Sequence, residues 1–195
     1  SGNDWTSSML RDGFITGLAD AQIDSTPLVC ITGQVASHLL GTDAFQETDV
    51  VGISTPVTKW NIQVTKASDI PAAIAKAFYV ARSGRPGPVL IDITKDAQFG
   101  TFEFEYEECK KVRSYVPETK IDPRQVEAAA ELINEAKRPY VLFGQGVILS
   151  GAEEEFKEFI EKGGLPAAWT ILGVSALGDD HPLNMGMLGM HGNYV

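Results

Sequence analysis

The chain has 195 residues, of which 44% are hydrophobic and 22% charged, and its net charge is −10 at pH 7. This hydrophobic content is typical of a folded globular protein and argues against disorder. An acidic surface repels phosphate and no cluster of Lys and Arg interrupts it, so nucleic acid is not an expected partner. The apolar runs are too short to span a bilayer. Residues 1–14 also lack the basic start and apolar core of a signal peptide. We therefore expect a cytoplasmic protein, or a fragment whose natural N-terminus is missing.

Three runs in the first half of the chain predict strands: PLVCIT (27–32), TKWNIQV (58–64) and GPVLIDI (87–93). The first and third are short, continuous and apolar, which is typical of strands that are fully buried. The second alternates apolar and polar residues, so it predicts a strand with one buried face.

A helix is predicted between the second and third of these strands, over SDIPAAIAKAFYVARSG (68–84). Ser68 or Asp69 can cap it, and its first turn contains a proline. Ile74 and Phe78 are spaced to form the buried face. From Thr94 to about Lys120 no regular pattern persists, and we interpret this acidic stretch as a linker with one edge-strand segment.

The second half repeats the alternation of helices and strands. DPRQVEAAAELINEAK (122–137) and AEEEFKEFIEKGG (152–164) predict helices, RPYVLFG (138–144) and LPAAWT (165–170) predict strands, and GQGVILSG (144–151) predicts a glycine-rich turn. Asp122 is the expected N-cap of the first helix. The predicted buried stripes are Val126, Ala130 and Ile133 in the first helix, and Phe156, Phe159 and Ile160 in the second. The fold class is therefore α/β, with parallel sheets and flanking helices.

Ligands of open parallel sheets gather at the carboxyl ends of the strands. After the first strand comes the stretch GTDAFQETD (41–49), and Lys95 follows the third. Gly144 and Gly146 follow the fourth, where they form either a nucleotide site or a simple tight turn. Lys95 is either an anchor for an anion or a solvated surface charge.

For several charged residues the sequence allows two interpretations. Arg85 either satisfies the last carbonyls of a helix or contacts an anion. Asp43, Glu47 and Asp49 form a possible carboxylate cluster, although Asp43 can equally cap a short helix that begins at Ala44.

The remaining metal and redox candidates are scattered. The two cysteines (Cys30 and Cys109) and three histidines (His38, His181 and His191) have no metal-ligand spacing. We expect two free thiols and no metal site.

Three segments of the sequence are more specific than the general patterns above: GLADAQIDSTPLVCITGQVASHLLGTDAFQETDVVGIS (17–54), SGRPGPVLIDITKD (83–96) and LGMHG (188–192). Together they resemble the large catalytic subunit of acetohydroxyacid synthase (acetolactate synthase), a thiamine diphosphate enzyme of branched-chain amino-acid biosynthesis. Enzymes of this family decarboxylate pyruvate on thiamine diphosphate and ligate the product to a second 2-oxoacid. They also contain Mg²⁺ and FAD, and they form homodimers with a regulatory small subunit.

The resemblance implies a domain for each part of the chain. Residues 1–97 resemble the C-terminal part of a pyrimidine-binding domain, and 98–120 a linker. Residues 121–195 resemble the N-terminal part of a Rossmann-like central domain that binds FAD. The chain thus resembles an internal fragment.

The resemblance also implies roles for particular residues. Phe45, Gln46 and Lys95 match positions that line the channel of the substrates, pyruvate and 2-oxobutyrate. The positions that hold FAD are matched by Arg85, Gly144, Gly146, Thr170, Ile171, Leu172, Gly189, Met190 and His191. No metal ligand is matched.

Three hypotheses follow from the sequence. The first is a piece of this synthase that by itself retains no cofactor and no activity, because the glutamate that activates thiamine and the Mg²⁺ ligands lie elsewhere in the family. Segment 1–14 also differs from the family's glycine-rich turn. The second is a non-catalytic ligand-binding or dimerisation module. The third is another thiamine diphosphate enzyme, such as a pyruvate oxidase or a glyoxylate carboligase. The string GTDAFQE favours the synthase over this third hypothesis.

Overall fold

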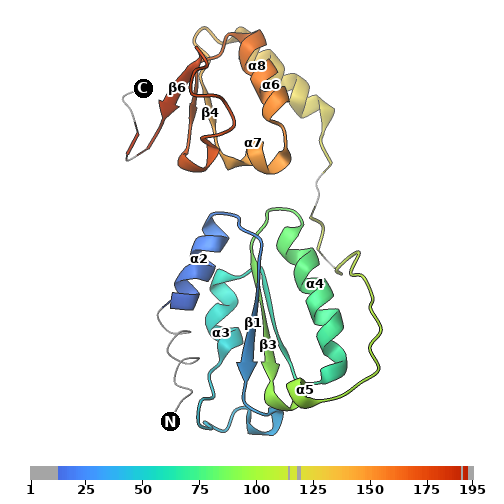
Figure 1. Cartoon of the computed structure of the whole chain (residues 1–195). Helices are drawn as coiled ribbons and strands as arrows, with labels where there is room; N and C mark the ends of the chain where they lie inside the picture. Colours follow the sequence, from blue (N-terminus) through green and yellow to red (C-terminus); the bar gives the residue numbers. More distant parts are fainter. Residues whose placement is uncertain (1–12, 114, 118–119, 190, 193–195) are drawn as a thin grey trace. The chain divides into compact units, whose positions relative to one another are not determined.

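The computed structural model describes residues 13–113, 115–117, 120–189 and 191–192. The chain divides into two compact units, 1–120 (unit 1) and 121–195 (unit 2) (Figure 1). Each unit contains a three-stranded sheet in which neighbouring strands are parallel. The predicted α/β class with parallel sheets is confirmed.

Unit 1 contains, in chain order, α2 (Ile15–Ile23), β1 (Leu28–Gln34), α3 (Val50–Ser54), β2 (Trp60–Val64), α4 (Ile70–Arg82), β3 (Pro88–Thr94) and α5 (Lys95–Phe99). Its strand order is β1-β3-β2, so β3 lies in the centre and is buried along its whole length, as predicted. The strand predicted at 58–64 is also confirmed, because Trp60, Ile62 and Val64 pack against the core.

The prediction of full burial was wrong for β1, since Ile31 is 58% exposed. This strand lies at the edge of the sheet, and the described residues cover its two faces unequally. A continuous apolar run predicts that a strand exists but does not determine its position in the sheet.

Helix α4 covers one face of the sheet and α2 and α3 cover the other (Figure 1). Four small or medium residues of α4 are buried, and they include Ala73 and Ala77. Phe78 is 53% exposed, so its predicted place on the buried face was wrong. Alanines allow the helix to lie close to the sheet, and the buried face follows them rather than the larger side chain. Asp69 occupies the N-cap position but makes no side-chain cap hydrogen bond.

On the opposite face, Cys30 packs in a cluster with Leu18, Val50 and Leu90. Burial raises the pKa of the Cys30 thiol. Cys30 and Cys109 are both free, in agreement with the sequence analysis.

The segment after α5 is irregular. Among its described residues there is no strand, only an isolated bridge between Val112 and Tyr115, so the predicted edge strand was wrong. Phe104 and Tyr106 are exposed and have no strand beside them to complete a ladder. The Tyr115 hydroxyl donates to the Ser83 carbonyl at 2.9 Å, which fixes this part of the segment to unit 1.

Unit 2 contains α6 (Pro123–Glu135), β4 (Val141–Phe143), α7 (Gln145–Ser150), α8 (Glu153–Gly163), β5 (Ala167–Trp169) and β6 (Asn184–Met187). The strand order is β4-β5-β6. Its core is formed mainly by Phe143, Ile160, Leu165, Ala167 and Leu177. The third strand, β6, was not predicted, because NMGM is short and contains a glycine.

Other predictions for unit 2 have mixed outcomes. Asp122 caps α6 by accepting from the Arg124 N–H, as predicted. The predicted turn at 144–151 is mostly the helix α7, which ends at Gly151 in the left-handed region. The predicted stripe of α6 is exposed, with Val126 at 56%, and Phe159 of α8 is 41% exposed.

The predicted burial was therefore wrong for the stripe of α6 and for Phe159, and it was confirmed for Ile160 of α8. The apolar pattern does not show whether a given part of the chain packs against a helix. Within the part of the chain that the structure describes, no helix is long and apolar enough to cross a membrane.

Candidate functional site

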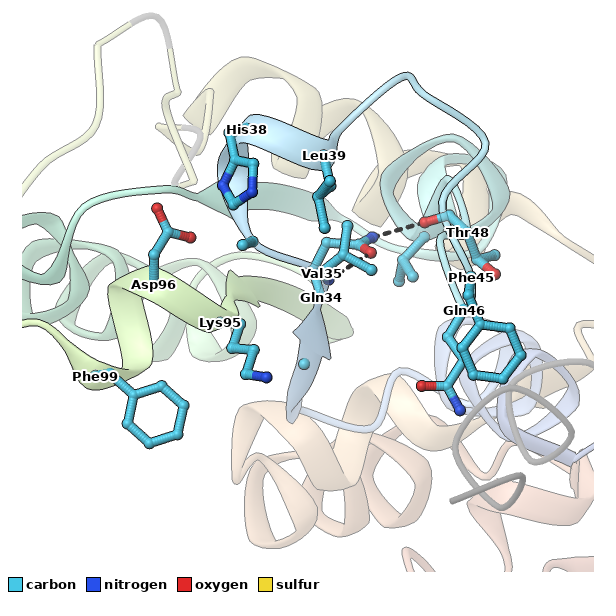
Figure 2. Close-up of a pocket in the computed structure, with 13 residues that line it drawn as sticks. Gln34, Val35, His38, Leu39, Phe45, Gln46, Thr48, Lys95, Asp96 and Phe99 are labelled. Carbon is cyan, nitrogen blue, oxygen red and sulfur yellow. Dashed lines mark hydrogen bonds between the residues drawn. The ribbon is translucent and has the colours of Figure 1, made fainter. Parts of the chain in front are cut away.

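A pocket of about 640 Å³ lies where β1 and β3 of unit 1 end (Figure 2). Gln34 and Thr94 are paired at the carboxyl ends of these strands, so the residues that follow them meet at one edge of the sheet. Lys95 reaches the pocket from the start of α5, and Phe45 and Gln46 reach it from the loop after β1. The three residues that the sequence analysis selected for a substrate channel therefore line one pocket of ordinary size for a small ligand.

The loop 41–47 is built around the carboxylate of Glu47. This carboxylate accepts hydrogen bonds from the backbone N–H groups of Gly41, of Thr42 at 3.2 Å and of Ala44 at 3.0 Å. These donors, the Gly41 N–H most of all, hold the pKa of Glu47 below its usual range. The loop is tight, because Gly41, Asp43 and Gln46 all have positive φ.

This geometry explains why the sequence exposes an aromatic residue in a polar stretch. With Glu47 turned inward to the backbone, the loop directs Phe45 outward, and this side chain is 86% exposed. Gln46 adopts φ +67°, in the left-handed region that non-glycine residues rarely occupy. A non-glycine residue held in this conformation is a frequent mark of a functional loop.

The three carboxylates of this stretch do not form an acid–base pair. Asp49 is the N-cap of α3, where it accepts from the Gly52 N–H at 2.8 Å, and Glu47 holds the loop. The suggested helix beginning at Ala44 is not formed, so Asp43 does not cap it. Two of the three carboxylates thus serve the backbone.

The floor of the pocket is fixed by the side-chain amide of Gln34. Its Nε2 donates to the Thr48 carbonyl at 2.7 Å, and its Oε1 accepts the Val35 N–H at 2.9 Å (Figure 2). The end of β1 is therefore tied to the end of the loop that carries Phe45 and Gln46.

A second carboxylate fixes the wall beside Lys95. Asp96 accepts from the Ser37 hydroxyl at 2.5 Å and from the Ser37 N–H at 2.8 Å. These bonds, with the hydroxyl contributing most, hold the pKa of Asp96 well below its usual range. The sequence analysis did not select Asp96 or Ser37. The available signal was the position of Asp96 directly after a strand.

Lys95 and the loop face one another across the pocket. In Figure 2 the Lys95 side chain points into the space on whose other side Phe45 and Gln46 lie. Lys95 is exposed, and its ammonium group places a positive charge beside an aromatic wall, while the Asp96 carboxylate on the same pocket is bonded to Ser37. Such an arrangement suits a small anion with an apolar part.

Arg85 makes structural contacts in unit 1. Its Nε donates to the Ser25 hydroxyl at 2.8 Å, and its Nη2 donates to the Ile23 carbonyl at 2.9 Å. Arg85 therefore satisfies the end of α2, which is the first of its two predicted roles. Its match to an FAD position is a separate expectation, which these contacts do not test.

Most of the residues matched to FAD positions meet at the carboxyl edge of the sheet in unit 2. Gly144 follows β4, Thr170 follows β5, and Gly189 lies shortly after β6. The others in unit 2 are Gly146 in α7, Ile171 and Leu172 in the 3-10 helix 171–173, and His191. Met190 lies outside the described residues, and Arg85 belongs to unit 1.

This edge is closely packed around Gly144. A Cβ at Gly144 would lie 2.8 Å from the Thr170 Oγ1, and a Cβ at Gly173 would lie 2.8 Å from the Gly144 Cα. Two backbone segments thus approach each other without side chains between them, which the two glycines allow.

The described residues contain no group of three or more His, Cys, Asp and Glu that could hold a metal ion. His181 has a local partner, since its Nε2 lies 3.4 Å from a carboxylate oxygen of Glu161.

The comparisons with known proteins agree with one another on the kind of enzyme that this chain is similar to. Residues 126–195 match the model of the thiamine pyrophosphate enzyme central domain. Over 187 residues, or 96% of the chain, the sequence is 48% identical to the acetolactate synthase large subunit of Corynebacterium glutamicum. It is 45% identical over 185 residues to the large subunit of acetolactate synthase isozyme 1 of Escherichia coli.

A solved structure supports the same relationship. The chain is similar, with a TM-score of 0.74 and 30% identity, to a proposed thiamin diphosphate-dependent enzyme isolated from Mycobacterium smegmatis. The match covers 90% of this chain and 34% of that one. The chain likewise spans 30% of the length of the Corynebacterium relative and 32% of the Escherichia coli one.

Proposed function

We propose, since the chain belongs to the family of thiamine pyrophosphate enzymes, that it is part of an acetolactate synthase large subunit. The whole enzyme would decarboxylate pyruvate and ligate the product to a second 2-oxoacid, pyruvate or 2-oxobutyrate. The observation that carries this proposal is the pocket in which Phe45, Gln46 and Lys95 meet.

The residues of the pocket suit a 2-oxoacid. The ammonium group of Lys95 attracts the carboxylate of the incoming substrate. Phe45 offers an apolar ring against which the methyl or ethyl end of the substrate would pack. The Gln46 amide offers both a donor and an acceptor for a keto or hydroxyl oxygen. Thiamine diphosphate, when bound by the whole enzyme, supplies the carbon centre at which pyruvate loses carbon dioxide.

Unit 2 suits a dinucleotide. We assign its carboxyl edge to FAD, held by the described residues of unit 2 matched above, because Gly144 and Gly146 leave the backbone at the start of α7 free of side chains at these two positions and a Cβ at Gly146 would meet nothing within 4 Å. The N–H groups at the start of α7 would face the pyrophosphate. In this proposal FAD is bound but takes no part in net redox chemistry.

The two units then correspond to parts of larger domains. Residues 1–97 would form part of the pyrimidine-binding domain, 98–120 a linker and 121–195 part of a Rossmann-like central domain. The whole enzyme would be a homodimer that contains Mg²⁺ and binds a regulatory small subunit. Because the family places the activating glutamate and the metal ligands outside the matched segment, the isolated chain is expected to bind no cofactor and to form no acetolactate.

The test uses the enzyme that contains this segment. Lys95→Gln should raise the KM for pyruvate about tenfold and change kcat less, because the positive charge acts on the arriving carboxylate. Lys66→Gln is the matched control, since Lys66 is exposed in the same unit but does not line the pocket. An unchanged KM in Lys95→Gln would contradict the role of Lys95.

Two further measurements address the family role itself. Absence of acetolactate formation by the unsubstituted whole enzyme would reject the synthase and favour a non-catalytic module or another thiamine enzyme. For the isolated chain, thiamine-dependent turnover of pyruvate, or a flavin absorption band after purification, would reject the expectation that it is inactive and free of cofactor.

A further inference from the structure

The centre of the sheet in unit 1 contains a buried carboxylate that the proposed function does not use. Asp92 lies in β3, the central strand, and its side chain is fully buried. An acidic residue in an otherwise apolar buried strand is costly unless its oxygens are hydrogen-bonded. Its described partners explain how it is accommodated.

Asp92 accepts hydrogen bonds from side chains of both neighbouring strands. The Thr32 hydroxyl of β1 donates to Oδ1 at 2.8 Å. The amides of Gln34 in β1 and Gln63 in β2 each donate from Nε2 to Oδ2 at 3.1 Å. All three described partners are neutral side chains, and each of them donates to a carboxylate oxygen of Asp92. Asp92 therefore sets the direction in which each neighbouring amide points.

Gln34 transmits this orientation to the pocket. Its Nε2 faces both Asp92 and the Thr48 carbonyl, which leaves its Oε1 for the Val35 N–H. If residue 92 presented a donor to Gln34, this amide would have to turn and would lose the Val35 N–H or the Thr48 carbonyl. Thr48 ends the loop whose Gln46 is held at positive φ, so a change at Asp92 reaches Phe45 and Gln46 through a single side chain.

We propose that Asp92 is a positioning residue, which fixes the amide of Gln34 and through it the loop that carries Phe45 and Gln46. The inference rests on the proposed function only for its effect on 2-oxoacid substrates. The positioning itself is a property of unit 1 and is measurable without activity.

The experiment measures amide hydrogen exchange of Val35 by NMR in the full 195-residue chain. Gln34→Glu places two carboxylates face to face, so residue 34 should turn away and exchange at Val35 should speed about tenfold or more. Asp92→Asn alone is a milder change, because its amide oxygen can still accept from Gln34 while its Nδ2 donates to the Thr32 hydroxyl oxygen, so exchange should stay within about threefold of the original chain. The double variant restores a donor–acceptor pair in the reverse sense. Its new carboxylate at position 34 can accept both from the new amide at position 92 and from the Val35 N–H. Exchange should therefore return to within about threefold of the original chain.

Thr32→Val is the matched control. It removes one donor to the same carboxylate without touching Gln34, and exchange at Val35 should stay within about twofold of the original. If Gln34→Glu alone does not fold, recovery of the fold in the double variant decides the question instead. Gln34→Glu without effect, or a double variant whose effect is the product of the two single effects, would overturn the proposal.

The effect on the site is tested in the whole enzyme. Gln34→Glu should raise the KM for pyruvate about threefold or more, and the double variant should remain impaired because Thr48 still lacks its donor. An unchanged KM in an active enzyme would overturn the role of Asp92 at the site. If the original enzyme forms no acetolactate, the proposed function fails, whereas the Val35 measurement still decides the positioning role.

Discussion

Gly173 offers a quantitative test of the close approach at the carboxyl edge of unit 2. A Cβ at this position would lie 2.8 Å from Cα, 3.0 Å from C and 3.3 Å from O of Gly144. Ordinary carbon–carbon contacts lie at about 3.5–4.0 Å, so Gly173→Ala forces two backbone segments apart by about 0.7 Å or more. Because Gly173 is buried and backbone cannot rotate away as a side chain does, we expect a loss of about 2 kcal/mol.

The assay is urea unfolding of the full chain, followed by the amide NMR signals of Ala167 and Ala168. These residues are buried in the sheet of unit 2, so their signals report this unit separately. Signals of Leu90 and Ile91 report unit 1 and should keep their midpoint.

Gly146→Ala is the matched control for Gly173→Ala. A Cβ at Gly146 would meet nothing within 4 Å, and its helical position favours alanine, so unit 2 should gain about 0.5 kcal/mol. If unit 2 of the Gly173→Ala variant is as stable as unit 2 of the original chain, the steric argument is refuted. In the whole enzyme, Gly146→Ala also separates stability from ligand binding, because a residue that approaches FAD should weaken flavin retention even though the fold is stabilised.

Three further outcomes are expected. The pKa of Asp96 is lowered in the folded chain, so its contribution to the stability of unit 1 is present at neutral pH and is lost as the pH falls below its ordinary value of 3.8. Asp96→Asn should abolish this part of the acid dependence in an unfolding titration, and an identical pH profile would contradict it. Ile160→Ala should destabilise unit 2 by about 3 kcal/mol in urea unfolding, because the Ile160 side chain is fully buried. The Phe159 side chain is already 41% exposed, so Phe159→Ala should destabilise unit 2 by about 1 kcal/mol or less. Glu47→Gln keeps the size of the side chain but removes its charge. It should therefore increase amide exchange in the loop 41–47 and leave exchange in β3 unchanged, and equal loop exchange would show that Glu47 does not hold the loop.

The sequence was most informative where a segment has only one favourable structure. The apolar run at 87–93 predicts a strand, and Asp122 followed by Pro123 starts a helix for local reasons. It was less informative for the short helices α5 and α7, because a few residues with no long apolar stripe carry little periodicity.

The candidate site divides in the same way. Residues that follow a strand are predictable as neighbours at one edge, and this places Lys95 near the loop after β1. The partners inside the site are not predictable from spacing, because Ser37 and Asp96 are distant in the sequence and meet only when β1 and β3 pair.

By itself the sequence determined the α/β class, the alternation of strands and helices, and the strings that resemble a thiamine diphosphate enzyme. These depend on local preference, apolar periodicity and short motifs, which are all read along the chain. Only the tertiary structure decided which apolar faces are covered, as Phe78 and Val126 show, and which carboxylates serve the backbone. It also revealed that Asp92 joins three strands through neutral donors. Such facts depend on the order of strands in a sheet and on contacts between distant residues.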